Sequence, residues 1–366
     1  MEFSDAYRGK KILLTGHTGF KGGWLALWLE KLGAEVVGFS TEPPSQPSLF
    51  EAAGIESTVR HVHGDIRDPA ALDAVFEAHQ PEVVFHLAAQ PLVRLSYDEP
   101  DSTFETNVMG TLRVFEAIRR SSSVRTLINV TSDKCYENRE WVWGYRENDP
   151  MGGYDPYSAS KGCAELLFSA WYRSFFNPAK LGDTHHVAAA SVRAGNVIGG
   201  GDWGKDRLVP DCFRALSEKQ PIVIRSPSAI RPWEHVLEPL SGYLAVGAKL
   251  MEDPVKYGGG WNFGPRGGDD WNVEALVKEI CGIWGDGKYE VDGGAHPHEA
   301  HWLKLDISKA NIQLGWAPRW NVKRALQETT RWYRKFYDGA SVEDMRAFTL
   351  EQITLYEQTT PGHSEG

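Results

Sequence analysis

The sequence KILLTGHTGFKGG at residues 11–23 decides the fold. Residues 11–15 form a short apolar run that stops at Gly16, as a buried strand does, and the apolar residues of 20–32 predict a helix directly afterwards. Glycines at 16, 19 and 22 lie between them. A tight turn of this kind brings the N–H groups of the helix N-terminus close to the phosphates of a dinucleotide. An ordinary strand-to-helix turn is the alternative, but the position after the first strand favours a dinucleotide site.

Apolar strands and helices alternate along the first half of the chain. This alternation predicts an α/β protein with a doubly wound parallel sheet of the Rossmann type. After Asn196, Gly and Pro become frequent, which predicts a smaller mixed α/β substrate lobe at the carboxyl edge of the sheet. Strands are expected at 36–39, 59–62, 83–87, 126–130, 187–192 and 222–224. Helices are expected at 70–78, 103–121, 157–176, 236–251, 272–284 and 322–338.

These patterns divide the chain of 366 residues into three parts. We expect a dinucleotide-binding domain at 1–195, a substrate lobe at 196–354 and a frayed polar tail at 355–366. The boundary near 195 is soft, because some later helices are expected to return to the first domain.

Composition excludes several classes of protein. A content of 42% hydrophobic and 24% charged residues is that of a globular chain, and no apolar run approaches the ~18 residues of a membrane span. A net charge of −10 argues against binding to nucleic acid. The four cysteines are too far apart for a zinc site or a disulfide framework, and the N-terminus lacks a signal-peptide core. We therefore expect a cytoplasmic protein that does not bind a membrane.

Further residues of the predicted dinucleotide site follow later strands. Asp65 is placed to accept from an adenine amino group while Ile66 packs on the ring; a helix cap is the alternative, for which Asp68 is better placed. The second strand ends in Ser40-Thr41 instead of the acid that often holds the ribose. These hydroxyls can hydrogen-bond a ribose but do not repel a 2′-phosphate, so they favour NAD over NADP only weakly. The candidate cofactor contacts are Gly16, Thr18, Gly19, Phe20, Lys21, Gly22, Ser40, Asp65, Ile66, Leu87, Ala88 and Ala89.

Two segments carry acid–base chemistry. Tyr157 and Lys161 are four residues apart, so they share one face of a helix, where an ammonium can stabilise a phenolate base. Such a pair also arises by chance on surface helices. Ser132, Asp133 and Lys134 follow the fifth strand, where side chains point into the ligand crevice of a parallel sheet. The alternative for this second segment is a polar turn capped by Asp133.

Together these motifs resemble a known family. The glycine turn, residues 87–90, Asn107, Ser132-Asp133 and the Tyr157/Lys161 pair are similar to the extended short-chain dehydrogenase/reductases that act on nucleotide sugars, over nearly the whole chain. More narrowly, residues 16–24 and 131–136 resemble those of the CDP-glucose 4,6-dehydratases. The resemblance implies NAD as a cofactor that Asn107, Tyr157 and Lys161 help to bind, and CDP-glucose as substrate. It also implies a role in deoxysugar biosynthesis for a surface polysaccharide.

The mechanism that the resemblance implies assigns a role to each polar side chain. Tyr157 takes the proton from sugar O4 while hydride leaves C4 for NAD, and Ser132 orients O4. Lys134 removes the C5 proton and Asp133 protonates the departing C6 hydroxyl. Hydride then returns to C6, which gives CDP-4-dehydro-6-deoxyglucose and water. Whether Asp133 and Lys134 instead form an ion pair stays open.

The resemblance further implies a set of substrate contacts and a homodimer. Helices 103–121 and 157–176 are more apolar than one buried face requires, as expected for a two-fold contact. No metal is expected, because His296, His298 and His301 match no metal-ligand spacing. Two alternatives to this function remain. The first is another nucleotide-sugar 4,6-dehydratase or a 4-epimerase, and the second, more remote, is a non-catalytic protein that senses the cofactor. The candidate substrate contacts are Gln90, Arg193, Asn196, Arg207, Arg231, His235 and Asn262.

Overall fold

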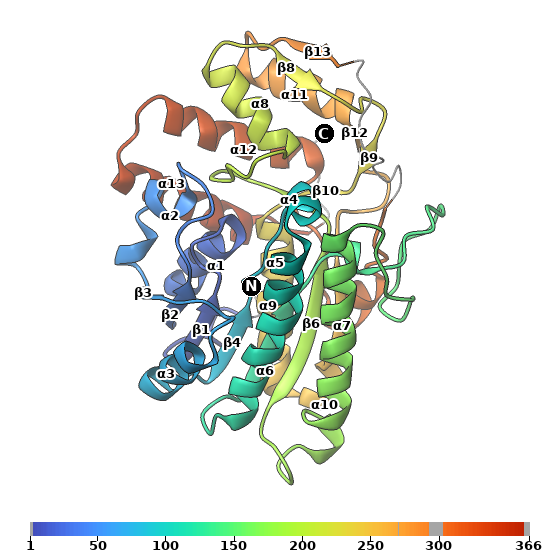
Figure 1. The fold of residues 1–366 in the computed structure, drawn as a ribbon. Coiled ribbons are helices and arrows are strands. Elements are labelled where there is room, and N and C mark those ends of the chain that lie inside the picture. The colour runs from blue at the N-terminus through green and yellow to red at the C-terminus, as the bar shows by residue number, and fades with distance from the viewer. Residues whose placement is uncertain (1–2, 270, 293–302, 362–366) are drawn as a thin grey trace.

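A seven-stranded parallel sheet forms the centre of the computed structural model, which describes residues 3–269, 271–292 and 303–361 (Figure 1). The strand order is β11-β6-β5-β4-β1-β2-β3, and every neighbouring pair is parallel. The predicted doubly wound sheet is therefore confirmed. Its strands are β1 (Lys11–Thr15), β2 (Glu35–Ser40), β3 (Arg60–His63), β4 (Val83–His86), β5 (Thr126–Val130), β6 (Ala188–Ala194) and β11 (Gly259–Phe263).

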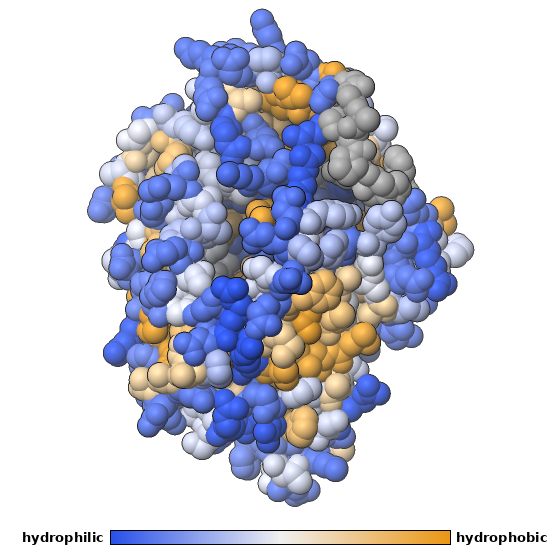
Figure 2. Space-filling view, in the orientation of Figure 1, coloured by the Kyte–Doolittle hydropathy of each residue, from blue (hydrophilic) through white to orange (hydrophobic). Residues whose placement is uncertain are grey.

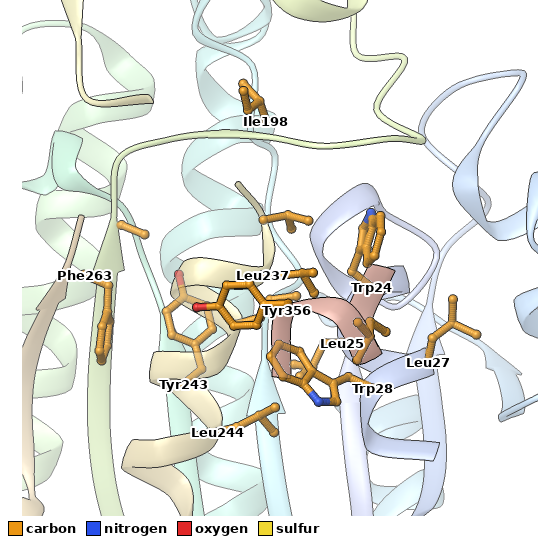
Figure 3. Close-up of a cluster of buried hydrophobic side chains, with 14 of the residues drawn as sticks. Trp24, Leu25, Leu27, Trp28, Ile198, Leu237, Tyr243, Leu244, Phe263 and Tyr356 are labelled. Carbon is orange, nitrogen blue, oxygen red and sulfur yellow. The ribbon is translucent and has the colours of Figure 1, made fainter. Parts of the chain in front are cut away.

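Helices cover both faces of the sheet because side chains alternate along its strands. Leu13 of β1 packs with the helices of one face, whereas Ile12 and Leu14 pack with those of the other. Figure 3 shows the second of these clusters, in which Trp28 lies edge-on to Tyr356 with ring centroids 5.8 Å apart. The first face carries α3 (Pro69–His79), α6 (Thr111–Arg120) and α7 (Pro156–Ser174). The second carries α1 (Phe20–Lys31), α9 (Leu237–Glu252) and α13 (Val342–Gln358).

The predicted helix at 103–121 consists of three consecutive elements. They are α5 (Pro100–Phe104), a π-helical segment η2 (Glu105–Gly110) and α6. π-Helical turns are often found at functional sites. The remaining short helices are α2 (Leu49–Ala52), η1 (Ile55–Ser57), α4 (Val93–Asp98), η3 (Asp133–Cys135), η4 (Pro178–Lys180), α10 (Pro254–Tyr257) and η5 (Ala310–Leu314).

A smaller group of elements lies beyond the carboxyl ends of the strands, at the top of Figure 1. It contains three two-stranded pairings: β7 with β10 and β8 with β13 are parallel, and β9 with β12 is antiparallel. The strands are β7 (Asn196–Ile198), β8 (Ile222–Ile224), β9 (Ile230–Arg231), β10 (Trp233–His235), β12 (Trp271–Asn272) and β13 (Tyr289–Val291). The helices are α8 (Leu208–Ser217), α11 (Val273–Trp284) and α12 (Val322–Tyr337).

Several segments after residue 195 pack with the sheet. Strand β11 pairs with β6, α9 covers β5 and β6, and α13 contacts α1. The predicted polar tail at 355–366 is wrong in its first part, because α13 continues to Gln358. Tyr356 is fully buried and donates to Glu238 at 2.6 Å, which anchors this end of the helix. Residues 362–366 lie outside the described part.

Candidate active site

The order of strands reverses at β1, which lies between β2 and β4. Ligands of open α/β sheets bind outside the carboxyl ends of the strands at such a point. The glycine turn lies here and is closely packed: Gly16 has φ +79°, and a Cβ atom on it would lie 2.8 Å from the Ala88 nitrogen. A Cβ atom on Gly22 would lie 2.1 Å from the Gly16 carbonyl oxygen. Glycine is therefore required at both positions, and the helix N-terminus stays open to a diphosphate.

Hydroxyl groups bring the end of β2 against this turn. The Thr18 Oγ1 and Ser40 Oγ atoms are 2.7 Å apart, and Thr18 also donates to the Thr41 carbonyl oxygen at 3.2 Å. His17 contacts His61 across 2.8 Å between Nε2 and Nδ1, and burial lowers the pKa of His17 to about 3. The end of β2 thus presents hydroxyl groups in place of an acid, and the imidazole of His17 beside it is neutral.

The loop after β3 holds the predicted adenine contacts. Asp65 forms an ion pair with Arg67 at 2.7 Å, and this hydrogen-bonded partner lowers the pKa of Asp65. Ile66 is buried against η2, where a Cβ atom on Gly110 would lie 2.7 Å from its Cδ1 atom. Asp68 caps α3 by accepting from the next residues, as expected. Asp65 is therefore not needed as a cap.

Asn107 lies in η2 and ties together two loops of the site. Its amide donates to the Gln90 carbonyl oxygen at 3.0 Å and to Ser160 Oγ at 2.9 Å, and its Oδ1 atom accepts from the Gln90 N–H at 2.8 Å. Asn107 thus holds the loop that contains Gln90 against α7.

The acid–base residues come together at the ends of β5 and α7. Ser132 caps η3: its hydroxyl accepts from the Lys134 N–H at 3.2 Å and donates to Asp133 Oδ1 at 2.9 Å. The Lys134 ammonium lies 3.8 Å from the same oxygen, so the ion pair that the sequence left open forms, although the Lys134 side chain remains 33% exposed. Asp133 Oδ2 is buried and has no hydrogen-bond partner in the described part of the chain. The segment thus offers an acid, an amine and a hydroxyl to one crevice.

Helix α7 places Tyr157 beside this segment. Asp155 caps the helix, and the Lys161 ammonium lies 6.0 Å from the Tyr157 ring centroid. Burial raises the pKa of Tyr157 to about 12, and a hydrogen bond with Ser132 opposes that rise. Burial also lowers the pKa of Lys161 to about 8. Without ligand, burial therefore outweighs the cation that was expected to lower the pKa of the phenol.

The GDP-mannose 4,6 dehydratase family matches residues 13–329. The chain belongs to this family. A CDP-glucose 4,6-dehydratase of Salmonella typhimurium is 52% identical over 355 residues, covering 97% of this chain and 98% of that protein. A dTDP-glucose 4,6-dehydratase of Xanthomonas campestris is 26% identical, covering 88% and 92%.

Solved structures share the fold of this GDP-mannose 4,6 dehydratase family member. A UDP-glucose 4-epimerase of Thermus thermophilus in complex with NAD has a TM-score of 0.76 at 22% identity and covers 88% of this chain and 98% of that chain. At this identity the likeness shows the fold alone.

Two of the residues predicted to contact the substrate, Arg193 and Asn262, are buried. Arg193 is 4% exposed and pairs with Glu165 at 2.7 Å, while Asn262 has no exposed surface and accepts from Tyr136 at 2.8 Å. Arg193 and Asn262 are opposite each other in the pairing of β6 with β11, and both contact the Tyr136 hydroxyl. In the structure the two residues support the loop that follows β5.

His235 and Gln90 also differ from expectation. His235 is fully buried between Trp24 and Trp320, with ring centroids 5.7 and 4.9 Å away, and burial lowers its pKa to about 3. The Gln90 amide donates to Thr103 at 2.8 Å and to the Leu92 carbonyl oxygen at 3.1 Å. Both side chains therefore serve packing or loop structure.

The other three predicted contacts are Arg207, Asn196 and Arg231. Arg207 pairs with Asp202 at 2.8 Å, and its charge acts on Tyr157. Asn196 Oδ1 is buried and has no hydrogen-bond partner among the described residues. Arg231 is half-buried on β9 and donates to its neighbouring carbonyl oxygen at 3.0 Å.

One residue of the site escaped the sequence analysis. Glu234 of β10 is buried, and neither carboxylate oxygen has a hydrogen-bond partner within the described ranges. Burial raises the pKa of Glu234, and its charge interacts with Glu238, Lys21 and Asp133. Lys21, at the start of α1, lies 3.4 Å from the Tyr243 hydroxyl. An acidic residue within the apolar run 233–237 was the signal that could have revealed it.

The described residues contain no group of three or more side chains suited to a metal ion, and no helix long and apolar enough to cross a membrane. His296, His298 and His301 lie outside the described part.

Proposed function

We propose that this chain is an NAD-dependent CDP-glucose 4,6-dehydratase, which converts CDP-glucose to CDP-4-dehydro-6-deoxyglucose and water. The observation that carries the proposal is the cluster of Ser132, Asp133 and Lys134 beside Tyr157, because elimination needs an acid and a base in addition to an oxidising site. The CDP-glucose 4,6-dehydratase of Salmonella typhimurium, identical at 52% of positions, supports the choice of nucleotide.

NAD fits the residues of the proposed cofactor site. The glycine turn leaves no room for side chains at Gly16 and Gly22, and the Thr18 and Ser40 hydroxyls can bind a ribose. Asp65, Ile66 and residues 87–89 would complete the site. When bound, NAD accepts hydride from sugar C4 and returns it to C6 of the dehydrated sugar.

Tyr157 is the proposed base for the O4 proton, and Ser132 holds O4 toward it. The Lys161 ammonium stabilises the phenolate from the next turn of α7. Without ligand the pKa of the Tyr157 phenol is about 12. A positive charge on the cofactor ring would lower this pKa.

Lys134 and Asp133 are the proposed pair for elimination. Once C4 is a ketone, the C5 proton becomes acidic, and Lys134 removes it. Asp133 gives a proton to the C6 hydroxyl, which leaves as water. Lys134 then returns a proton to C5. The remaining candidates for contacts with the sugar diphosphate are Arg207, Arg231 and Asn196. The two arginines suit this role because a guanidinium group can bind a phosphate through two hydrogen bonds.

We also propose a homodimer formed through α5, α6 and α7. Figure 2 shows hydrophobic residues gathered over the region where Figure 1 places α6 and α7. Exposed side chains on or beside these helices include Phe104, Met109, Leu166 and Phe175. Covering such an area with the same area of a second copy is the common two-fold solution. Light scattering that gives a monomer mass at micromolar concentration would contradict the dimer.

Mass spectrometry of the products tests the function. Purified protein with NAD should convert CDP-glucose to a product lighter by one water, and should act more slowly on dTDP-glucose, UDP-glucose and GDP-mannose. A product of unchanged mass that chromatography separates from the substrate would indicate an epimerase instead. No product from any of the four would indicate a non-catalytic protein.

A further inference from the structure

Helix α7 carries a buried carboxylate that the proposed mechanism does not use. Glu165 follows Tyr157 and Lys161 at intervals of four residues, so the three side chains lie along one face of the helix. The Glu165 side chain is 2% exposed, which leaves it too buried to contact a sugar in the crevice. A buried carboxylate costs free energy unless it is paired and hydrogen-bonded, so its partners indicate its role.

Side chains from β6 and from the end of β5 converge on this carboxylate. Its Oε1 atom accepts from the Thr131 hydroxyl and from Ser191 Oγ at 2.8 Å, and its Oε2 atom accepts from the Arg193 guanidinium at 2.7 Å. Ser191 and Arg193 belong to β6, and Thr131 comes directly after β5. Burial raises the pKa of Glu165, but Arg193 and the hydroxyls outweigh burial and hold this pKa below its usual value. Glu165 and Arg193 therefore form a buried ion pair.

Arg193 extends this network to the far end of the catalytic segment. Its guanidinium donates to the Tyr136 hydroxyl. Tyr136 is 1% exposed and comes directly after η3. The ion pair thus holds the chain at Thr131, on one side of residues 132–134, and at Tyr136 on the other side. The segment that carries the groups for elimination is tied at both ends to the helix that carries the base for oxidation.

Stability alone does not require charges at this place. A buried ion pair is often no more stabilising than well-packed apolar side chains of the same volume, because the lost hydration offsets the attraction between the charges. Hydrogen bonds between a carboxylate and a guanidinium add a defined geometry, which apolar packing does not supply. The contribution of Glu165 and Arg193 that apolar residues could not replace is the placement of the segment 131–136 against α7.

We propose that the Glu165–Arg193 ion pair is a positioning device, which holds residues 132–134 in place relative to Tyr157 so that oxidation and elimination act on one bound sugar. This inference rests on the proposed dehydratase function. Neither charged residue contacts the substrate, and each acts through the residues that it holds. Without the pair the segment can shift relative to α7, and a displacement of about 1 Å is enough to slow a reaction by about 10²-fold.

The double variant Glu165→Leu/Arg193→Met tests the proposal. It removes both charges together and leaves neither of them unpaired in the core, so it should still unfold cooperatively in urea, with a midpoint near that of the parent. Its kcat with CDP-glucose should fall by about 10²-fold while KM changes little. Elimination should slow more than oxidation, so reduced cofactor should accumulate during turnover at the nicotinamide absorbance. A folded double variant with the kcat of the parent would overturn the proposal.

A milder pair of variants at Thr131 leaves the ion pair intact. Thr131→Val removes only the hydroxyl that donates to Glu165, whereas Thr131→Ser keeps a hydroxyl there. Thr349→Val is the matched control, because the buried Thr349 hydroxyl accepts from Trp332 at 2.9 Å between α12 and α13. Thr131→Val should lower kcat and raise the fraction of reduced cofactor, Thr131→Ser should restore both, and Thr349→Val should affect urea unfolding only.

The Thr131 variants decide the question even if the double variant does not fold. The same kcat and the same fraction of reduced cofactor in Thr131→Val as in Thr349→Val would overturn the positioning role and leave the dehydratase proposal intact. Absence of any dehydrated product from the parent would instead contradict the proposed function itself.

Discussion

Replacement of Lys134 separates two roles that the structure allows for this residue. Its ammonium lies 3.8 Å from Asp133 Oδ1, with the Lys134 side chain 33% exposed. A partly exposed ion pair of this kind contributes at most about 1 kcal/mol, which corresponds to roughly a fivefold effect. Loss of a positioned base, by contrast, slows a reaction by about 10²–10⁴-fold. The size of the effect therefore distinguishes a residue that holds Asp133 from one that removes the C5 proton.

Lys134→Met should block elimination while leaving C4 oxidation possible. With CDP-glucose, the variant should accumulate reduced cofactor, seen at the nicotinamide absorbance, without dehydrated product. Exchange of the C5 hydrogen with solvent deuterium should disappear as well. Asp133→Asn should differ, because the ketone still acidifies C5 and exchange persists while water loss is slow.

Lys134→Arg is the matched control. It keeps a cation next to Asp133, but a guanidinium does not lose its proton in proteins and cannot act as the base. If Lys134 is the base, Lys134→Arg loses C5 exchange as Lys134→Met does. Elimination within about fivefold of the parent in either variant, the limit set by the ion pair alone, would refute the base assignment.

Four other substitutions probe the site. Tyr157→Phe should retain ligand binding, measured by calorimetry, but lose about 10²–10⁴-fold in activity; a loss of only a few-fold would exclude Tyr157 as the base. Burial raises the pKa of the Glu234 carboxyl in the folded state, so the folded protein holds this proton more tightly than the unfolded chain does. As the pH rises above the pKa that Glu234 has in the unfolded chain, the buried carboxyl therefore lowers the free energy of unfolding. The gain in unfolding free energy of Glu234→Gln over the parent should therefore increase from pH 5 to pH 8, and a pH-independent difference would contradict this. Gly22→Ala should destabilise the fold by about 1–3 kcal/mol and weaken NAD binding, because its Cβ would lie 2.1 Å from the Gly16 carbonyl oxygen. Gly19→Ala, whose Cβ would lie 3.4 Å from the same oxygen, should leave stability nearly unchanged in urea titrations.

Local patterns were sufficient for much of the fold. The alternation of apolar runs predicted the parallel sheet as far as β6, and Asp68 before Pro69 marked the start of α3. The i, i+4 spacing of Tyr157 and Lys161 placed both on one helix face. These features depend on neighbours in sequence, which a single chain displays directly.

Contacts between distant segments were harder to predict. Residue types alone do not say which side of a short strand faces the crevice, so Arg193 and His235 were assigned to ligand contacts although both are buried. In β10, Trp233 and His235 are buried in the core, and the charge of Glu234 between them interacts with those of Lys21 and Asp133. The pairing of β11 with β6 likewise joins segments that no local pattern relates.

The central claim is an oxidation, elimination and reduction within one sugar, and hydride tracing tests it most directly. CDP-glucose deuterated at C4 should yield CDP-4-dehydro-6-deoxyglucose with the deuterium at C6, because the hydride taken from C4 returns to the same molecule. Deuterium that remains at C4, or that is lost to the cofactor pool without reaching C6, would contradict the account.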